Sequence, residues 1–207
     1  MQGKEVFLEK NKNVFLFILF LFLFLFLFNN QAKSNQNEDL IKNKLIEYLL
    51  NTKEISSGFI QINNDFMQEG TFHLKKNRLR IEYNKPNKII IVVKKSNAMY
   101  YNVDLQEVQY FNPKNTVAEF FYSLFYNKNF LNDVDYKFEK KSFSIKKIYK
   151  IDGEKNTIIV YFEKSPLKIR KIELNNIDGK ILFGIINLNY NPNLDDKLFS
   201  LANPLLG

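Results

Sequence analysis

The chain has 207 residues, with 30 lysines and arginines against 22 aspartates and glutamates, and its formal net charge is +8. It contains no cysteine and only one histidine. These counts exclude a disulfide framework, a cysteine nucleophile, a cysteine-bound metal and a lipid-modified cysteine, and they rule out a His-rich metal site. We interpret the positive charge as a solvated, Lys- and Asn-rich surface and expect no nucleic-acid partner.

An apolar run over residues 14–28 dominates the N-terminal part of the chain. Three lysines precede it, and the small-x-small sequence Ala32-Lys33-Ser34 follows it, which is typical of a signal peptide and its cleavage site. A membrane-spanning helix needs about 20 apolar residues, which is more than this run supplies. The sequence therefore predicts a signal peptide over residues 1–34, export to the periplasm and a mature domain over residues 35–207. An uncleaved inner-membrane anchor is the alternative.

Hydrophobic periodicity predicts a helix at the start of the mature domain. Between residues 35 and 52, the apolar side chains of Leu40, Ile41, Leu45, Tyr48 and Leu49 recur at near-helical spacing. From residue 55 onward the period drops to two, which is typical of strands with one buried face. We therefore expect one helix followed by a β-rich domain.

The segment from residue 78 to residue 83 alternates completely, so that Leu79, Ile81 and Tyr83 share one strand face and charged residues share the other. Phe72 and Leu74 share a face of the preceding segment in the same way. Further strands are predicted over residues 88–94, 98–103, 107–111, 143–151, 157–163, 168–174 and 180–190. Tight turns at 152–153 and 178–179, both Asp-Gly, favour antiparallel hairpins.

A second helix is predicted over residues 116–126, where Phe120, Phe121, Leu124 and Phe125 recur at helical spacing together with a valine. Thr116, three residues before a glutamate at position 119, forms the sequence pattern of a capping box. Such an aromatic helix either fills a solid core or covers a cavity for an apolar ligand. Composition leaves both interpretations open.

Catalytic motifs are missing from the sequence. The single histidine, His73, lies on the polar face of its predicted strand, which favours an exposed side chain over a general base or a zinc ligand. The neighbouring carboxylates at 133 and 135 and at 195 and 196 lie in Asn-rich loops, which favours solvated turn residues. No Gly-rich phosphate loop, GxSxG elbow or HExxH helix occurs. We expect no enzyme activity, no cofactor and no metal.

Several segments, in their order along the chain, resemble the LolA family of periplasmic carriers of outer-membrane lipoproteins. The resemblance covers most of residues 36–204. It is carried by Ser57–Gln61, Gly70–Lys76 followed by Asn77–Tyr83 and Pro86, Tyr100–Asn102 with Val108, Asn115–Phe121, Pro166–Ile172, Asp178–Lys180, and Leu198–Phe199 near Pro204.

The resemblance implies an incomplete antiparallel β-barrel closed by a short helical lid, with an apolar cavity for acyl chains. Leu79 matches a cavity-facing position of the family. Phe72, Leu74, Ile81 and Tyr83 share such faces and are expected to line the cavity, with core packing as the alternative. The expected lid residues are Phe120, Phe121, Leu124 and Phe125.

The family usually has an arginine, followed by proline, that is thought to hold the lid. Lys76 occupies the matching position here, and it keeps the charge but loses the planar guanidinium fork. We expect Lys76 to be the lid latch, with Arg78 or Arg80 as substitutes that are more simply interpreted as outward-facing strand charges.

The function implied is a monomeric carrier that receives acylated lipoproteins from an inner-membrane ABC transporter and delivers them to an outer-membrane acceptor. An RseB-like periplasmic regulator on the same scaffold is one alternative. Regulators of that kind are longer, with a second C-terminal domain, so the length of 207 residues leads us to expect the carrier. A membrane-tethered lipid carrier is another. A LolB-type acceptor needs a lipidated cysteine, which is absent.

Overall fold

The computed structural model describes residues 36–114, 116–127, 129–151, 154–177 and 179–206. The signal peptide predicted over residues 1–34 and the turn residues at 152, 153 and 178 lie outside these ranges. The chain divides into two compact units, residues 1–43 and 44–207. A helix covers residues 36–51, close to the predicted range of 35–52.

None of the helices in the described part of the chain has both the length and the apolar character that crossing a membrane requires.

Eleven strands and two further helical segments follow in the described part of the chain. The strands are β1 Glu54–Asn63, β2 Phe66–Lys75, β3 Arg78–Lys85, β4 Ile89–Lys94, β5 Asn97–Asn102, β6 Glu107–Phe111, β7 Asp135–Phe138, β8 Ser142–Ile151, β9 Glu154–Lys164, β10 Leu167–Asn176 and β11 Gly179–Tyr190. The helical segments are α2 Val117–Tyr126 and the short 3-10 helix η1 Asp196–Phe199.

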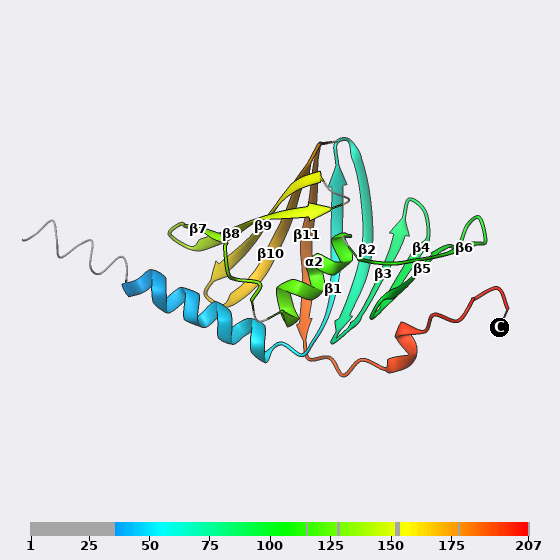
Figure 1. Ribbon diagram of the computed structural model, residues 1–207, viewed down its shortest axis with the longest axis horizontal. Helices are drawn as coiled ribbons and strands as arrows, with labels where there is room; N and C mark the ends of the chain where they lie inside the picture. The colour runs from blue at the N-terminus through cyan, green and yellow to red at the C-terminus, as the bar shows by residue number, and fades with distance from the viewer. Residues whose placement is uncertain (1–35, 115, 128, 152–153, 178, 207) are drawn as a thin grey trace, which may run out of the picture. The chain divides into compact units, whose positions relative to one another are not determined.

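The strands form one antiparallel sheet in the order β6-β5-β4-β3-β2-β1-β11-β10-β9-β8-β7. Strands next to each other in the sequence pair with each other, except β6 and β7, which form the two edges of the sheet. The first and last strands, β1 and β11, pair in its middle. The sheet curls around α2 without closing (Figure 1). The predicted fold class, an incomplete antiparallel barrel with a helical lid, is therefore confirmed. The sequence pattern did not indicate β7, which has only four residues.

Register decides which side chains share a face of the sheet. Phe72 pairs with Ile81, and Leu74 pairs with Leu79. These side chains lie on one face, which we call the inner face, and the charged residues of β3 lie on the other, the outer face. The alternation predicted for residues 78–83 is confirmed because Leu79 is only 1% exposed.

The inner face of β8, β9 and β10 carries a solid core. Phe143, Ile145, Val160 and Phe162 are each 1% exposed, and the rings of Phe143 and Phe162 stack with centroids 5.0 Å apart. Leu45 and Leu49, from the second half of the 36–51 helix, are buried as well. In the same half of the helix, Tyr48 contacts Phe162 edge-to-face, so this part of the helix and the core form one packed layer.

Helix α2 begins at Val117, one residue after the predicted start, and its capping differs from the prediction. The Thr116 hydroxyl donates to the carbonyl of Pro113 at 2.6 Å instead of accepting from the helix. The Glu119 amide donates to the backbone carbonyl of Thr116 at 3.1 Å. The Thr116 hydroxyl is therefore bonded to a carbonyl three residues upstream and does not make the hydrogen bond of a capping box.

Candidate functional site

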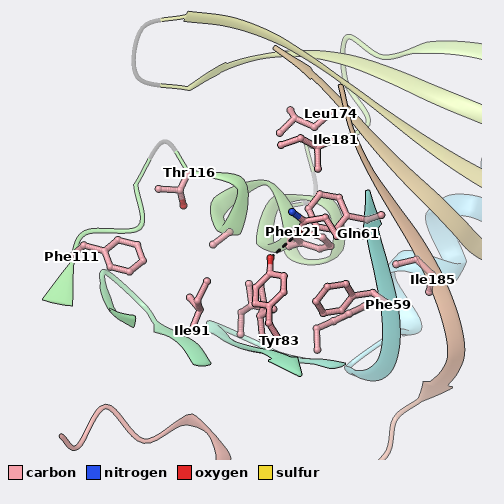
Figure 2. Close-up of a pocket in the computed structure, with 15 residues that line it drawn as sticks. Phe59, Gln61, Tyr83, Ile91, Phe111, Thr116, Phe121, Leu174, Ile181 and Ile185 are labelled. Atoms are coloured by element: carbon pink, nitrogen blue, oxygen red, sulfur yellow. Dashed lines mark hydrogen bonds between the residues drawn. The ribbon is translucent and has the colours of Figure 1, made fainter. Parts of the chain in front are cut away.

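A cavity of about 320 Å³ lies between α2 and the inner face of the sheet (Figure 2). Its walls come mainly from β1–β4, β10, β11 and α2. The lining residues are Phe59, Gln61, Phe72, Leu79, Ile81, Tyr83, Ile91, Phe111, Thr116, Ala118, Phe121, Leu174, Ile181, Phe183 and Ile185. Nearly all are apolar, so a hydrocarbon chain would find no unpaired charge against it here.

Four of the five residues predicted to face the cavity do line it, namely Phe72, Leu79, Ile81 and Tyr83. Leu74 does not, although it shares their face of the sheet. Its side chain is fully buried, and its register partner on β1, Ile55, is only 1% exposed. Leu74 therefore belongs to the packed core beyond the end of the cavity, which corrects the prediction for this residue.

The four aromatic and aliphatic residues predicted for the lid separate into two groups. Phe121 lines the cavity, and its ring lies 5.9 Å from that of Phe72 and 6.3 Å from that of Phe183. Phe120 contacts Phe130 and Tyr149 instead, with centroids 5.5 and 6.3 Å away. Successive helical residues point about 100° apart, so adjacent phenylalanines meet different surroundings.

Leu124 and Phe125 are buried but are not cavity-lining residues. That these four residues of α2 act as a lid stays a prediction. Helix α2 instead presents Ala118 to the cavity together with Phe121, and Thr116 lies at its beginning. The three-residue spacing of Ala118 and Phe121 was a signal for this face, but a small residue next to a pair of phenylalanines on a helix is easily overlooked.

Much of the wall comes from strands that the sequence analysis did not assign to the site. Phe59 on β1 lies edge-to-face on the Tyr83 ring at 5.2 Å and contacts Phe183 on β11 at 6.3 Å. This packing depends on Gly70, because a Cβ there would lie 2.7 Å from the Phe59 ring and 2.1 Å from the carbonyl of Glu82. The sequence shows Gly70, but it does not show that Gly70 lies opposite Phe59 in the sheet.

Two polar side chains interrupt the apolar lining on β1 and β3. The Tyr83 hydroxyl donates to Oε1 of Gln61 at 2.8 Å, and Nε2 of Gln61 donates to Oε1 of Gln68 at 3.1 Å. Burial raises the pKa of Tyr83 to about 12, so this hydroxyl stays protonated at neutral pH. None of the lining residues described carries a formal charge.

Two tyrosine hydroxyls attach α2 to the sheet. Tyr122 donates to the carbonyl of Val93 at 3.1 Å, and Tyr126 donates to the carbonyl of Lys53 at 2.9 Å. Burial raises the pKa of both hydroxyls, so they remain donors. Lys76, the predicted latch, lies in the exposed turn between β2 and β3, where no described residue accepts a hydrogen bond from it. These tyrosine hydrogen bonds therefore add to the packing of the buried side chains of Phe120, Phe121 and Leu124 in holding α2 in place.

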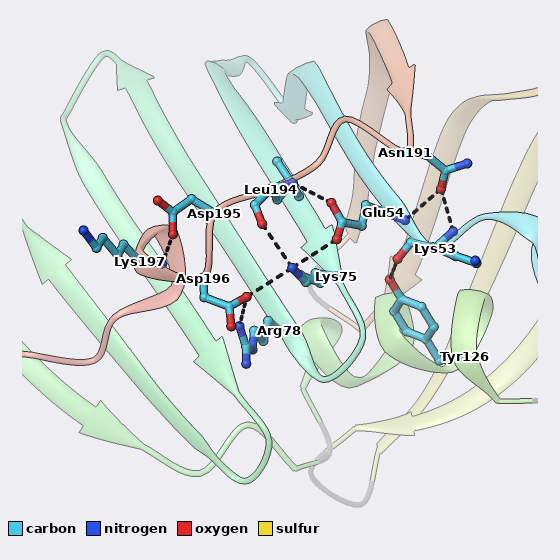
Figure 3. Close-up of polar contacts among 10 residues, drawn as sticks. All are labelled: Lys53, Glu54, Lys75, Arg78, Tyr126, Asn191, Leu194, Asp195, Asp196 and Lys197. Carbon is cyan, nitrogen blue, oxygen red and sulfur yellow. Dashed lines mark hydrogen bonds and ion pairs between the residues drawn. The ribbon is translucent and has the colours of Figure 1, made fainter.

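A charge network lies on the outer face, opposite the cavity (Figure 3). The ammonium of Lys75 contacts carboxylates of Glu54 and Asp196, each at 3.1 Å, and donates to the carbonyl of Leu194 at 3.0 Å. Arg78 pairs with the same Asp196. Arg78 and Lys75 hold the pKa of the Asp196 carboxyl at about 2, well below its usual value. Asp196 is therefore not a simple solvated turn residue.

The network fixes the segment that follows β11 to the sheet. Leu194 and Phe199 from this segment pack with Val92 and Met99 in a small core on the outer face. Arg80 donates to the carbonyl of Leu198 at 3.0 Å. Arg78 and Arg80 thus point outward, as the strand pattern predicts, and bind the C-terminal segment.

The remaining polar candidates show no catalytic arrangement in the described ranges. His73 is half-buried rather than exposed, and its Nδ1 lies 3.0 Å from the hydroxyl of Ser56, so the predicted exposure was wrong. Burial lowers the pKa of His73. Within the same ranges, no three histidine, aspartate or glutamate side chains converge as a metal site would require.

The family model described as outer membrane lipoprotein carrier protein LolA matches residues 50–202. The chain belongs to the LolA family. The match includes every strand of the sheet and all of α2, and hence the whole lining of the cavity. The predicted family membership is confirmed.

Solved structures that are similar to this chain are distant from it in sequence. An uncharacterized conserved protein from Thermus thermophilus is 11% identical, with a TM-score of 0.52 over 79% of this chain and 92% of that one. A DUF1329 family protein from Desulfovibrio piger is 10% identical, with a TM-score of 0.46 over 79% and 95%. The MucA/MucB complex of Pseudomonas aeruginosa contains a chain 14% identical, with a TM-score of 0.43 over 79% and 60%. No curated protein matches the sequence.

Proposed function

We propose that the protein is a periplasmic carrier that shields the acyl chains of lipoproteins in its cavity. In this proposal, residues 1–34 are a signal peptide, an inner-membrane ABC transporter loads the carrier, and an outer-membrane acceptor unloads it. The observation that supports the proposal most directly is the apolar cavity of about 320 Å³ beneath α2. Membership of the LolA family supports it independently.

The physical reason for such a carrier is the cost of exposing hydrocarbon to water. Each CH₂ group that leaves water contributes about 0.8 kcal/mol, so an acylated protein does not cross an aqueous space unless its chains are covered. A carrier must also release its cargo. The two tyrosine hydroxyl bonds of α2 contribute only about 0.5–1.5 kcal/mol each, so they oppose opening of the lid modestly, beside the apolar packing of α2.

In this proposal the inner-face side chains of Phe72, Leu79, Ile81 and Tyr83 contact the acyl chains, and Phe121 covers them from α2. Leu174 and Ile181 extend the same surface along β10 and β11. This proposal requires no catalytic residue. Loading and release require that the lid open, and that the carrier bind the acylated cargo more tightly than the transporter does and less tightly than the outer-membrane acceptor does.

Binding and cavity-blocking variants test this function. The mature protein should copurify with acylated cargo, detected by native mass spectrometry. Ala118→Phe, which fills the cavity from α2, and Leu79→Glu, which places a charge in it, should both abolish loading. Lys94→Glu, at an exposed position of β4, is the matched charge control. Arg80→Glu is a poorer control, because Arg80 also holds Leu198.

The outcome that contradicts the proposal is loading that persists in a folded Ala118→Phe variant. A protein that captures an unacylated peptide but no acylated one would instead be a regulator. The mass of the exported chain tests the leader separately. We expect it to begin at residue 35, whereas retention of residues 1–34 would make the protein membrane-tethered.

A further inference from the structure

Gln61 and Tyr83 form a polar pair in the wall of the cavity. Gln61 pairs with Gln68 across the β1–β2 hairpin, two residues from the last residue of β1, and Tyr83 pairs with Gly70 beside them. On one side of this pair the cavity continues to Leu79 on β3 and Ile185 on β11, and on the other side it continues to Leu174 on β10 and Ile181 on β11. Figure 2 shows the Tyr83 hydroxyl and the Gln61 amide joined by a hydrogen bond in a wall that is mostly hydrocarbon, with the Thr116 hydroxyl farther away.

The hydrogen-bond capacity of this polar pair is only partly used. The amide of Gln61 has two N–H groups, and one of them donates to Gln68. No described residue accepts from the other. The Tyr83 oxygen donates its proton to Gln61 and keeps its lone pairs. The site therefore offers a neutral donor beside a neutral hydroxyl oxygen, within a surface that suits a hydrocarbon chain.

The described lining of the cavity is uncharged, which limits the ligand groups that Gln61 and Tyr83 can bind. An ester or amide carbonyl is neutral and needs one donor, which the free N–H of Gln61 provides. A carboxylate would need a cation or several donors to offset its desolvation, and no lining residue described is cationic. A bare alkane would leave the Gln61 N–H unpaired under the bound chain, which costs free energy as well.

We propose that Gln61 and Tyr83 form a subsite for the ester or amide carbonyl of an acyl chain whose methyl end points toward Leu79 and Ile185. The cavity thereby selects esterified or amide-linked acyl chains over free fatty acids and over plain hydrocarbon. This inference rests on the proposed function, since it assumes that the cavity holds acyl chains, and it names the chemical group that distinguishes them.

Three ligands with similar chains test the subsite, namely hexadecane, methyl palmitate and palmitate, each delivered from cyclodextrin. Their dissociation constants are measured by displacement of one fluorescent apolar probe. At about pH 8, where the carboxyl is ionised, palmitate should bind at least tenfold more weakly than methyl palmitate. The ratio of the constants for hexadecane and methyl palmitate reports the hydrogen bond itself, because both ligands bury a similar chain.

Replacing Gln61 by Leu should shift that ratio against methyl palmitate by about three- to tenfold, as expected for one lost hydrogen bond. The exposed Gln109→Leu on β6 is the matched control and should leave the ratio unchanged. Gln61→Arg should reverse the preference and favour palmitate, because it supplies the missing cation. A purely structural Gln61 would change all three constants together.

The two proposals fail in different ways. If none of the three ligands displaces the probe from the wild-type protein, the carrier function is wrong. If all three bind but Gln61→Leu leaves their ratios unchanged and Gln61→Arg does not improve palmitate binding, the carrier function stands and the carbonyl subsite is overturned.

Discussion

Phe121 of α2 and Phe72 of β2 contact each other with ring centroids 5.9 Å apart, and both rings also line the cavity. This contact joins the lid to the sheet at the point where the ligand would lie. Removing either ring would therefore have two effects at once, a larger cavity and a less firmly held lid. Stability and binding are therefore coupled through the same pair of side chains.

Phe121→Ala tests this coupling. Phe121 is only 6% exposed, so its loss should lower the free energy of unfolding by about 3 kcal/mol, at the lower end for a buried phenylalanine because a cavity already lies beside it. Phe111→Ala is the control, since Phe111 lines the same cavity but is 39% exposed, and it should cost less than about 1 kcal/mol. Urea unfolding followed by circular dichroism measures both, and equal losses would contradict the assigned burial.

Gly70 determines how closely Phe59 approaches β2. Gly70→Ala would place a Cβ 2.1 Å from a backbone carbonyl, so the strands or the Phe59 ring must move, and we expect a loss above about 2 kcal/mol. Gly184→Ala is the matched change on β11, where the nearest atom is 3.7 Å away. It should be neutral or stabilising by up to about 1 kcal/mol. Thermal unfolding of the two variants separates these outcomes, and a stable Gly70→Ala protein would refute the packing.

The tyrosine hydroxyls of α2 should control how often the lid opens. Tyr122→Phe combined with Tyr126→Phe removes the bonds to Val93 and Lys53 while keeping the rings, and should speed amide hydrogen exchange in α2 by about tenfold. Tyr110→Phe removes a hydroxyl bond to Leu201, away from α2, and should leave the exchange of α2 unchanged. If Lys76→Ala accelerates exchange more than the tyrosine pair does, Lys76 is the latch after all.

Attachment of the C-terminal segment should depend on pH through Asp196. Its pKa falls from 3.8 to about 2 in the folded protein, mainly through the hydrogen bond from Arg78. A lowered carboxyl pKa means that the stabilisation is complete above about pH 4 and is lost as the pH falls toward 2. Limited digestion with pepsin between these values should release the segment after β11 progressively.

Asp196→Asn removes the charge and should make that release less dependent on pH over the same range. Some dependence should remain, because the Leu194 amide and Lys75 also lower the pKa of the Glu54 carboxyl. Asp195→Asn is the control, because the Asp195 side chain accepts from the Lys197 amide and an asparagine oxygen keeps that bond. Identical digestion profiles for the wild type and Asp196→Asn would show that the ion pairs do not hold the segment.

The parts of the fold that were predicted correctly are those encoded by local periodicity. The alternation around Leu79 and Ile81 identified one face of β3, and the 3.6-residue spacing around Phe120 identified α2, because each pattern depends only on neighbours along the chain. The same signals did not reveal that Phe121 faces the cavity while Phe120 faces Phe130. That distinction depends on which surface the helix meets.

By itself, the sequence determined that the domain is a mainly antiparallel β protein with an aromatic helix, without cysteine chemistry, and similar to the LolA family. Only the tertiary structure decided which side chains share the cavity. The pairing of β1 with β11 brings Phe59 beside Ile185, and folding of the C-terminal segment onto the outer face brings Asp196 to Lys75. Both contacts join residues more than a hundred positions apart, and no local pattern of polarity specifies such partners.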